Sequence, residues 1–73
     1  MNLQSIARAY TACAELEEKA RFESDGLAED LSVLRAELHA LLMETLREHK
    51  IPFSDRADAA RLAYELAAKH QAA

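Results

Sequence analysis

The sequence contains few of the residues that build compact ligand sites. Its 73 residues include one cysteine, one glycine, one proline and no tryptophan. One cysteine excludes an internal disulfide, and one glycine excludes the glycine-rich loops that hold phosphate groups. A single core of this size rarely contributes more than about 3–5 kcal/mol of stability, so small domains usually add disulfides, a metal or oligomerisation.

Residues that could bind a metal are also few and widely separated. They are Cys13, His39, His49 and His70. No cysteine pair, HExxH or Glu-x-x-His spacing is present, so we predict neither a metal nor another cofactor. Oligomerisation is therefore the expected support for the core. No pair of groups has catalytic spacing, and a three-helix domain has little room for a pocket, so we do not expect an enzyme.

Basic residues are too few and too scattered to suggest a nucleic-acid surface. The chain has 9 Lys and Arg against 13 Asp and Glu, for a net charge of −4, and the basic residues form no cluster. No apolar run approaches the roughly 20 residues of a membrane span. The N-terminal segment lacks the features of a signal peptide. We expect a cytoplasmic protein with a reduced thiol and no membrane contact. The abundance of Ala, Leu and Arg is typical of a GC-rich bacterial genome.

The dominance of alanine and leucine indicates an all-α protein. We predict one domain over residues 1–73, with helices at about 3–23, 27–49 and 55–70. Gly26 is expected just past the end of the first helix, and Pro52 disfavours helix at the residue before it. Candidate helix caps precede each helix, namely Asn2 or Ser5, Ser24 or Asp25, and Ser54 or Asp55.

The central helix has apolar residues on two of its faces. At about 100° per residue, five leucines with alternating spacings of three and four form one stripe, which consists of Leu27, Leu31, Leu34, Leu38 and Leu41. A second cluster lies roughly opposite and contains Val33, Ala36, Ala40 and Met43. An acidic ridge of Asp30, Glu37, Glu44 and Glu48 falls between them. Such a helix should be covered from two sides, and we predict that the second cluster is a dimer or partner interface.

The short break at residues 24–26 predicts that the first two helices form an antiparallel hairpin. The leucine stripe would then meet the first helix in layers, with Cys13 beside Leu38 and Tyr10 beside Leu41. Glu17 occupies a position of the first helix where an apolar residue is expected. The same spacing also runs through the break without slipping, so one continuous coiled-coil helix is an alternative.

The remaining candidates for chemistry have structural interpretations. We interpret Cys13 as a small buried residue and His39 as a part-buried residue at the flank of a helix. Acidic residues seven apart on a helix are about 10 Å apart, too far to share one ion. The ridge is thus interpreted as a solvated face, or as a docking surface for a basic partner.

These observations predict a homodimeric helical bundle, a hairpin with a shorter third helix. The function expected is that of a small non-enzymatic protein–protein interaction module, such as an adaptor, inhibitor or regulator. An alternative is a DNA-associated regulator that uses Arg56, Arg61 and Lys69 of the third helix in a dimer. A weaker alternative is a pure assembly module.

Overall fold

The computed structural model describes residues 2–23 and 25–72, with side chains up to Lys69. These residues form helices α1 (Leu3–Ala20), α2 (Asp25–Glu48) and α3 (Arg56–Ala72), and no strand occurs among them. The expected all-α class with three helices is therefore confirmed. At 17 residues, α3 is shorter than α2, which has 24.

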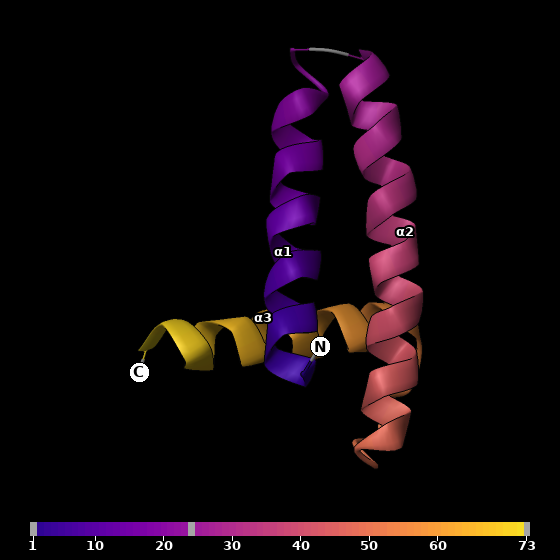
Figure 1. Ribbon diagram of the computed structural model, residues 1–73, viewed down its shortest axis with the longest axis vertical. Coiled ribbons are helices and arrows are strands. Elements are labelled where there is room, and N and C mark those ends of the chain that lie inside the picture. The colour runs from indigo at the N-terminus through magenta and orange to yellow at the C-terminus, as the bar shows by residue number, and fades with distance from the viewer. Residues whose placement is uncertain (1, 24, 73) are drawn as a thin grey trace.

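The helices α1 and α2 lie side by side and run in opposite directions, and α3 crosses one end of this pair (Figure 1). The chain turns at residues 21–23 and enters α2 at Asp25. The structure thus contains the hairpin and not the continuous helix. Ser24, a candidate cap, lies outside the described residues.

The start of α1 follows the expected capping pattern. Asn2 has an extended backbone, and its side-chain oxygen accepts a hydrogen bond from the Ser5 backbone N–H at 2.8 Å. One of the free N–H groups of the first turn is thereby satisfied. Asn2 is therefore the cap, and Ser5 lies inside the helix.

The end of α1 and the position of Gly26 differ from the expectation. The helix ends at Ala20, before the predicted residue 23, and Gly26 lies within the first turn of α2. Its φ is not positive, so it is not used as the left-handed residue that often ends a helix. A Cβ atom at this position would meet no other atom within 4 Å, so the packing does not require a glycine there.

The left-handed residue occurs instead after α2. Lys50 has a φ of 58°, the Lys50 N–H donates to the Arg47 carbonyl at 3.0 Å, and the Ile51 N–H donates to the Leu46 carbonyl at 2.9 Å. This pair of bonds is the Schellman motif, which usually has glycine at the left-handed position. Ile51 packs against the core, so the motif also directs the loop onto it.

At the start of α3, the side chains of Asp55 and Asp58 bond to backbone N–H groups. Asp55 precedes the helix, and its carboxylate accepts from the Asp58 N–H at 2.8 Å. The Asp58 carboxylate accepts from the Ser54 N–H at 2.9 Å. This bond, followed by the Arg61 side chain, lowers the pKa of Asp58. Asp55 is therefore the cap of the two predicted candidates.

The hydrophobic core lies where α3 crosses the hairpin. Its largest fully buried side chains are Ile6 of α1 and Leu42 and Leu46 of α2. From α3 it receives Ala59 and Ala63, whose small side chains let the helix backbones approach closely. The complete cluster consists of Leu3, Ile6, Ala7, Tyr10, Leu42, Leu46, Ala59 and Ala63.

The orientation of α2 differs from the prediction. The expected leucine stripe does not form the buried face, because Leu27, Leu34 and Leu41 are 50%, 48% and 39% exposed. The helix buries a neighbouring face instead, with His39, Leu42, Thr45 and Leu46. That face contacts both α1 and α3, whereas the leucine stripe could have faced only α1.

The register of the hairpin differs as well. The Cys13 thiol donates to the Leu31 carbonyl at 3.4 Å, and the Tyr10 ring meets the His39 ring edge-on with centroids 5.1 Å apart. The predicted neighbours of Cys13 and Tyr10 were Leu38 and Leu41. Cys13 and Tyr10 therefore contact residues nearer the start of α2 than those predicted, in agreement with its rotated face.

A buried ion pair joins the two helices of the hairpin. Glu17 is 6% exposed, and its carboxylate accepts a hydrogen bond from the guanidinium of Arg35. Glu17 also lies 3.7 Å from the exposed guanidinium of Arg21. The bond to Glu17 raises the pKa of Arg35 and keeps it charged. This contact explains why an acidic residue occupies the apolar stripe of α1.

His39 connects α2 to the beginning of α3. Its Nε2 lies 2.9 Å from the carbonyl oxygen of Arg56, and because a carbonyl only accepts, Nε2 must carry the proton. The ring is 5% exposed and Nδ1 has no partner among the described residues. The bond thus fixes α3 against the hairpin, at the energetic cost of one buried unsatisfied nitrogen.

We predict that Lys50→Gly stabilises the fold by about 0.5–1 kcal/mol, because glycine adopts the left-handed conformation without a steric penalty. Urea denaturation at one protein concentration measures the change. Lys50→Ala is the matched control, since it removes the same charge but keeps the Cβ atom. An equal midpoint for the two variants would contradict the assignment.

We predict that Arg35→Met destabilises the fold by about 2 kcal/mol, because it leaves the buried Glu17 carboxylate without its main partner. Glu17→Met should cost less, since it places an apolar residue in the apolar stripe. The double variant should recover most of the loss. A double-mutant cycle by chemical denaturation measures the coupling, and strictly additive effects would show that the pair is not coupled.

Candidate interaction surface

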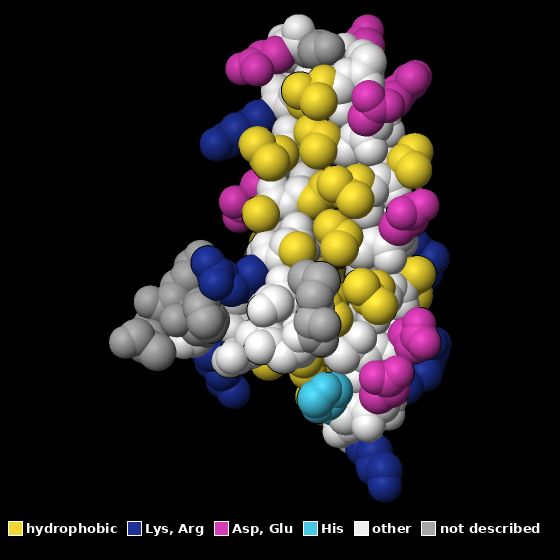
Figure 2. All heavy atoms as spheres, in the orientation of Figure 1, with side chains coloured by type: hydrophobic (Ala, Val, Ile, Leu, Met, Phe, Trp, Pro, Cys, Tyr) yellow, Lys and Arg dark blue, Asp and Glu magenta, His cyan; other side chains and the backbone are white. Residues whose placement is uncertain are grey.

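Large apolar side chains are exposed along one side of the hairpin. We call this surface the leucine face, and it consists of Leu16, Leu27, Leu34 and Leu41, which are 54%, 50%, 48% and 39% exposed. The last three recur every seven residues and so share one side of α2. In Figure 2 hydrophobic side chains form a column between the two long helices. An exposed apolar patch of this kind makes the leucine face a candidate contact surface.

The leucine face lies on the side of the hairpin away from α3. Met43 packs against the core cluster, and it is nine residues from Leu34, which at about 100° per residue places it on the opposite side of α2. On α1, Ala7 and Thr11 are buried, whereas Leu16 lies on another side of the helix. No described element of the chain covers the leucine face.

The outer half of the hairpin has little core beneath this face. The core cluster draws its α1 residues from the first half of that helix and its α2 residues from the second half. Beyond the crossing of α3, the hairpin continues as a two-helix arm (Figure 1). The buried side chains of α1 in this arm are Cys13, Glu17 and Ala20. Two helices with so small an interior gain little from burial on their own.

A hollow of about 410 Å³ lies at the end of the leucine face nearest the N-terminus. Ile6 and Leu41 form its apolar wall, and Glu44, Glu48 and His49 contribute polar groups, together with Thr45. The Thr45 hydroxyl is already used, since it donates to the Leu41 carbonyl at 2.8 Å.

The predicted acidic ridge borders the leucine face. Asp30, Glu37, Glu44 and Glu48 are all exposed on α2. Figure 2 shows acidic side chains in a row beside the hydrophobic column. No group of three or more His, Cys, Asp or Glu side chains in the described residues could hold a metal ion. The row is therefore a charged border of the leucine face.

The predicted interface of Val33, Ala36, Ala40 and Met43 lies on the other side of this acidic ridge. Val33 is 63% exposed, and Ala36 and Ala40 are exposed too. Met43 is partly buried against the core. Val33, Ala36 and Ala40 thus share one exposed side of α2, and only Met43 is turned toward the core. The sequence reasoning missed the leucine face because it assigned those leucines to the core.

The basic residues of α3 do not form one surface. Arg61 lies within hydrogen-bond distance of Asp58 and of Glu65, both at 2.7 Å, and these contacts raise the pKa of Arg61. Arg56 and Lys69 are exposed but thirteen residues apart, which places them about 140° apart around the helix. The charge available to a phosphate backbone is therefore small.

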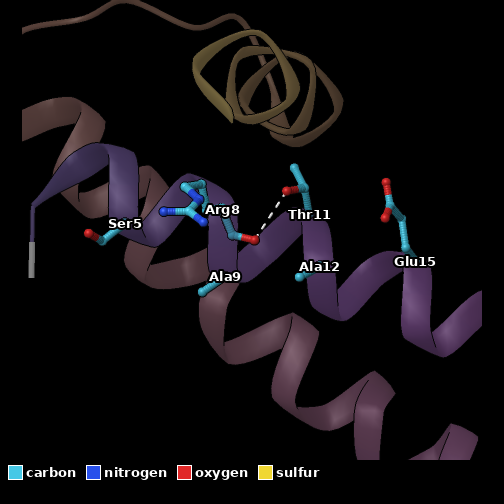
Figure 3. Close-up of a pocket in the computed structure, with 6 residues that line it drawn as sticks. All are labelled: Ser5, Arg8, Ala9, Thr11, Ala12 and Glu15. Carbon is cyan, nitrogen blue, oxygen red and sulfur yellow. Dashed lines mark hydrogen bonds between the residues drawn. The ribbon is translucent and has the colours of Figure 1, made fainter. Parts of the chain in front are cut away.

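A second hollow, of about 400 Å³, lies along the outer side of α1 (Figure 3). Its lining residues are Ser5, Arg8, Ala9, Thr11, Ala12 and Glu15. The Thr11 hydroxyl donates to the Arg8 carbonyl within the same helix at 3.1 Å. All six residues come from one helix and include no histidine or cysteine. The hollow therefore presents hydroxyl, guanidinium and carboxylate groups of a single helix.

Cys13 is the only thiol of the sequence, and no base among the described side chains is hydrogen-bonded to it. It is 4% exposed, and burial, followed by the charge of Glu17, raises its pKa above the usual value. Its hydrogen bond goes to a backbone carbonyl. A buried thiol with a raised pKa is mostly protonated near neutral pH and is a poor nucleophile. The geometry agrees with its interpretation as a small core residue.

No described helix is long and apolar enough to cross a membrane. Comparisons with protein-family models, with curated proteins and with solved structures find no match for this chain.

Proposed function

We propose that the protein is a small non-enzymatic protein–protein interaction module that acts as a homodimer through the leucine face. The observation that carries this proposal is the exposure of four leucines on the uncovered side of the two-helix arm. Fully burying a leucine stabilises a complex by about 1.5–3 kcal/mol. Covering this face would supply the stabilisation that the small core lacks.

The size of the face supports a stable dimer. The 24 residues of α2 make a helix about 36 Å long. Two packed helices are about 20 Å wide, since their axes lie 8–10 Å apart and each has a diameter of about 10–12 Å. The resulting area of about 700 Å² is close to the 800 Å² that each partner contributes to a standard interface.

The leucine face replaces the Val33 side as the interface in this proposal. The leucine face carries larger apolar side chains than the Val33 side. It also ends in the hollow at Leu41, which could accommodate a side chain of the partner. The acidic ridge separates the two surfaces. We also propose that the protein is located in the cytoplasm, where thiols stay reduced. The free, buried Cys13 supports this location.

The DNA-associated alternative has weaker support. Arg61 is held by two acidic neighbours on its own helix, and the chain is acidic overall. A pure assembly module would form the same homodimer but would bind no other protein.

We predict that the wild-type protein sediments at equilibrium with twice its chain mass of 8.1 kDa, and that Leu34→Asp yields a folded monomer. The substitution removes apolar contact and places an unpaired charge in the interface of each copy, so the dissociation constant should rise by more than about a hundredfold.

Val33→Asp is the matched control, because it adds the same charge to the neighbouring exposed position of the same helix. It should leave the dimer intact. Circular dichroism checks that both variants remain helical. A monomeric wild type, or a dimer that Val33→Asp dissociates and Leu34→Asp does not, would refute the leucine face as the interface.

A further inference from the structure

We propose that the two copies dock in parallel, with both hairpin turns at the same end of a four-helix bundle. This inference rests on the proposed function, because it requires that a second copy covers the leucine face. It names the orientation of that copy and the charged residues that select it.

Two symmetric arrangements bring the leucine faces together. Most homodimers have a two-fold axis, so the same surface of each copy forms the interface. If the axis runs along the helices, α1 of one copy lies over α2 of the other and the hairpins are parallel. If the axis runs across them, α1 lies over α1, α2 lies over α2, and the hairpins are antiparallel.

The two borders of the leucine face differ in charge. The border on α2 is acidic, and its exposed residues Asp30, Glu37 and Glu48 lie next to the leucines. The border on α1 is mixed, because the exposed cations Arg8 and Lys19 alternate there with the exposed carboxylates of Glu15 and Glu23. The surface is therefore asymmetric across its width.

The register of the hairpin sets the heights of these charges. The contacts Cys13–Leu31, Tyr10–His39 and Glu17–Arg35 join residues whose numbers total 44, 49 and 52. A residue of α1 is therefore level, to within about one helical turn, with the residue of α2 that brings the total to about 48. Lys19 is then at the level of Glu29 and Asp30.

The parallel arrangement pairs the acidic border of one copy with a cation of the other. It places Lys19 of each copy beside Asp30 of its partner. The antiparallel arrangement places the acidic ridge of one α2 against the same ridge of its partner. Like charges at an interface disfavour the wrong orientation more strongly than rim pairs favour the right one.

Spin labels test the orientation directly. Glu23→Cys and Glu48→Cys label opposite ends of the hairpin, each in a Cys13→Ser background whose hydroxyl can still donate to Leu31. In the parallel dimer both label pairs should lie within about 25 Å, the width of a four-helix bundle. Distances near the helix length of about 36 Å for both pairs would overturn the parallel orientation.

Reversing the charge of Asp30 provides an independent test, because the change in dimer affinity has opposite signs in the two orientations. In the parallel dimer Asp30→Lys opposes Lys19 and should weaken dimerisation about tenfold, and adding Lys19→Glu should restore it. In the antiparallel dimer Asp30→Lys would strengthen dimerisation, because lysine would face the acidic ridge. Glu29→Lys is the control, with the same charge change on a different side of α2.

Salt separates the charge effect from a packing effect. At 1 M salt the screening length is about 3 Å, so the difference between Asp30→Lys and wild type should largely disappear. A difference that persists would count against the rim pairs. A monomeric wild type would refute the proposed function as well, whereas a dimer with long label distances would refute the orientation alone.

Discussion

The arrangement of the molecule depends on one constraint, which is that a single face of α2 must contact two other helices. Leu42 and Leu46 achieve this because they are fully buried between α1 and α3. His39 lies on the same face and reaches the first carbonyl of α3. Once this face is turned inward, the leucines on the next side of the helix must turn outward. The exposed leucine face is thus a geometric consequence of how the core is closed.

The short side chains of α3 are what permit this closure. Ala59 and Ala63 are fully buried, and a helix that presents alanines can cross close to the hairpin. The same alanines bury little apolar area, so α3 adds less stability than a leucine-rich helix would. The fold therefore combines a tight crossing at one end with a weakly supported arm at the other.

Much of this fold could be predicted from the sequence because local signals define the helices. Asn2 and Asp55 are good caps, and Pro52 interrupts the pattern between the second and third helices. The rotation of α2 could not be predicted in the same way. Its apolar residues cover much of its circumference, so the pattern favours several inward faces almost equally. Long-range contacts to α3 decide among them, and α3 itself has weak amphipathic contrast.

The sequence contained part of the information needed to predict the exposed leucine face. The sequence pattern correctly indicated an apolar surface on each side of an acidic ridge, but it assigned the leucine stripe to the core. A third face of α2, which contains Leu42 and Leu46, is buried instead. Glu17 was the residue that could have revealed the error, since a carboxylate in a stripe requires a cation opposite. Arg35 lies between the leucine stripe and the second cluster, and pairing it with Glu17 turns α2 to the observed orientation.

Buried polar contacts and exposed leucines have complementary roles in such a small domain. The Glu17–Arg35 pair contributes little net stability against an apolar replacement, but it penalises other rotations and registers of α2. Burial of the leucines would contribute stability but would not select one orientation of a partner helix, because apolar contacts are not directional. In the dimer proposed for this chain, apolar and charged residues would have the same two roles in the contact between the copies. The leucine face would supply the affinity, while the acidic border on α2 and the basic residues on α1 would determine how the second copy is aligned.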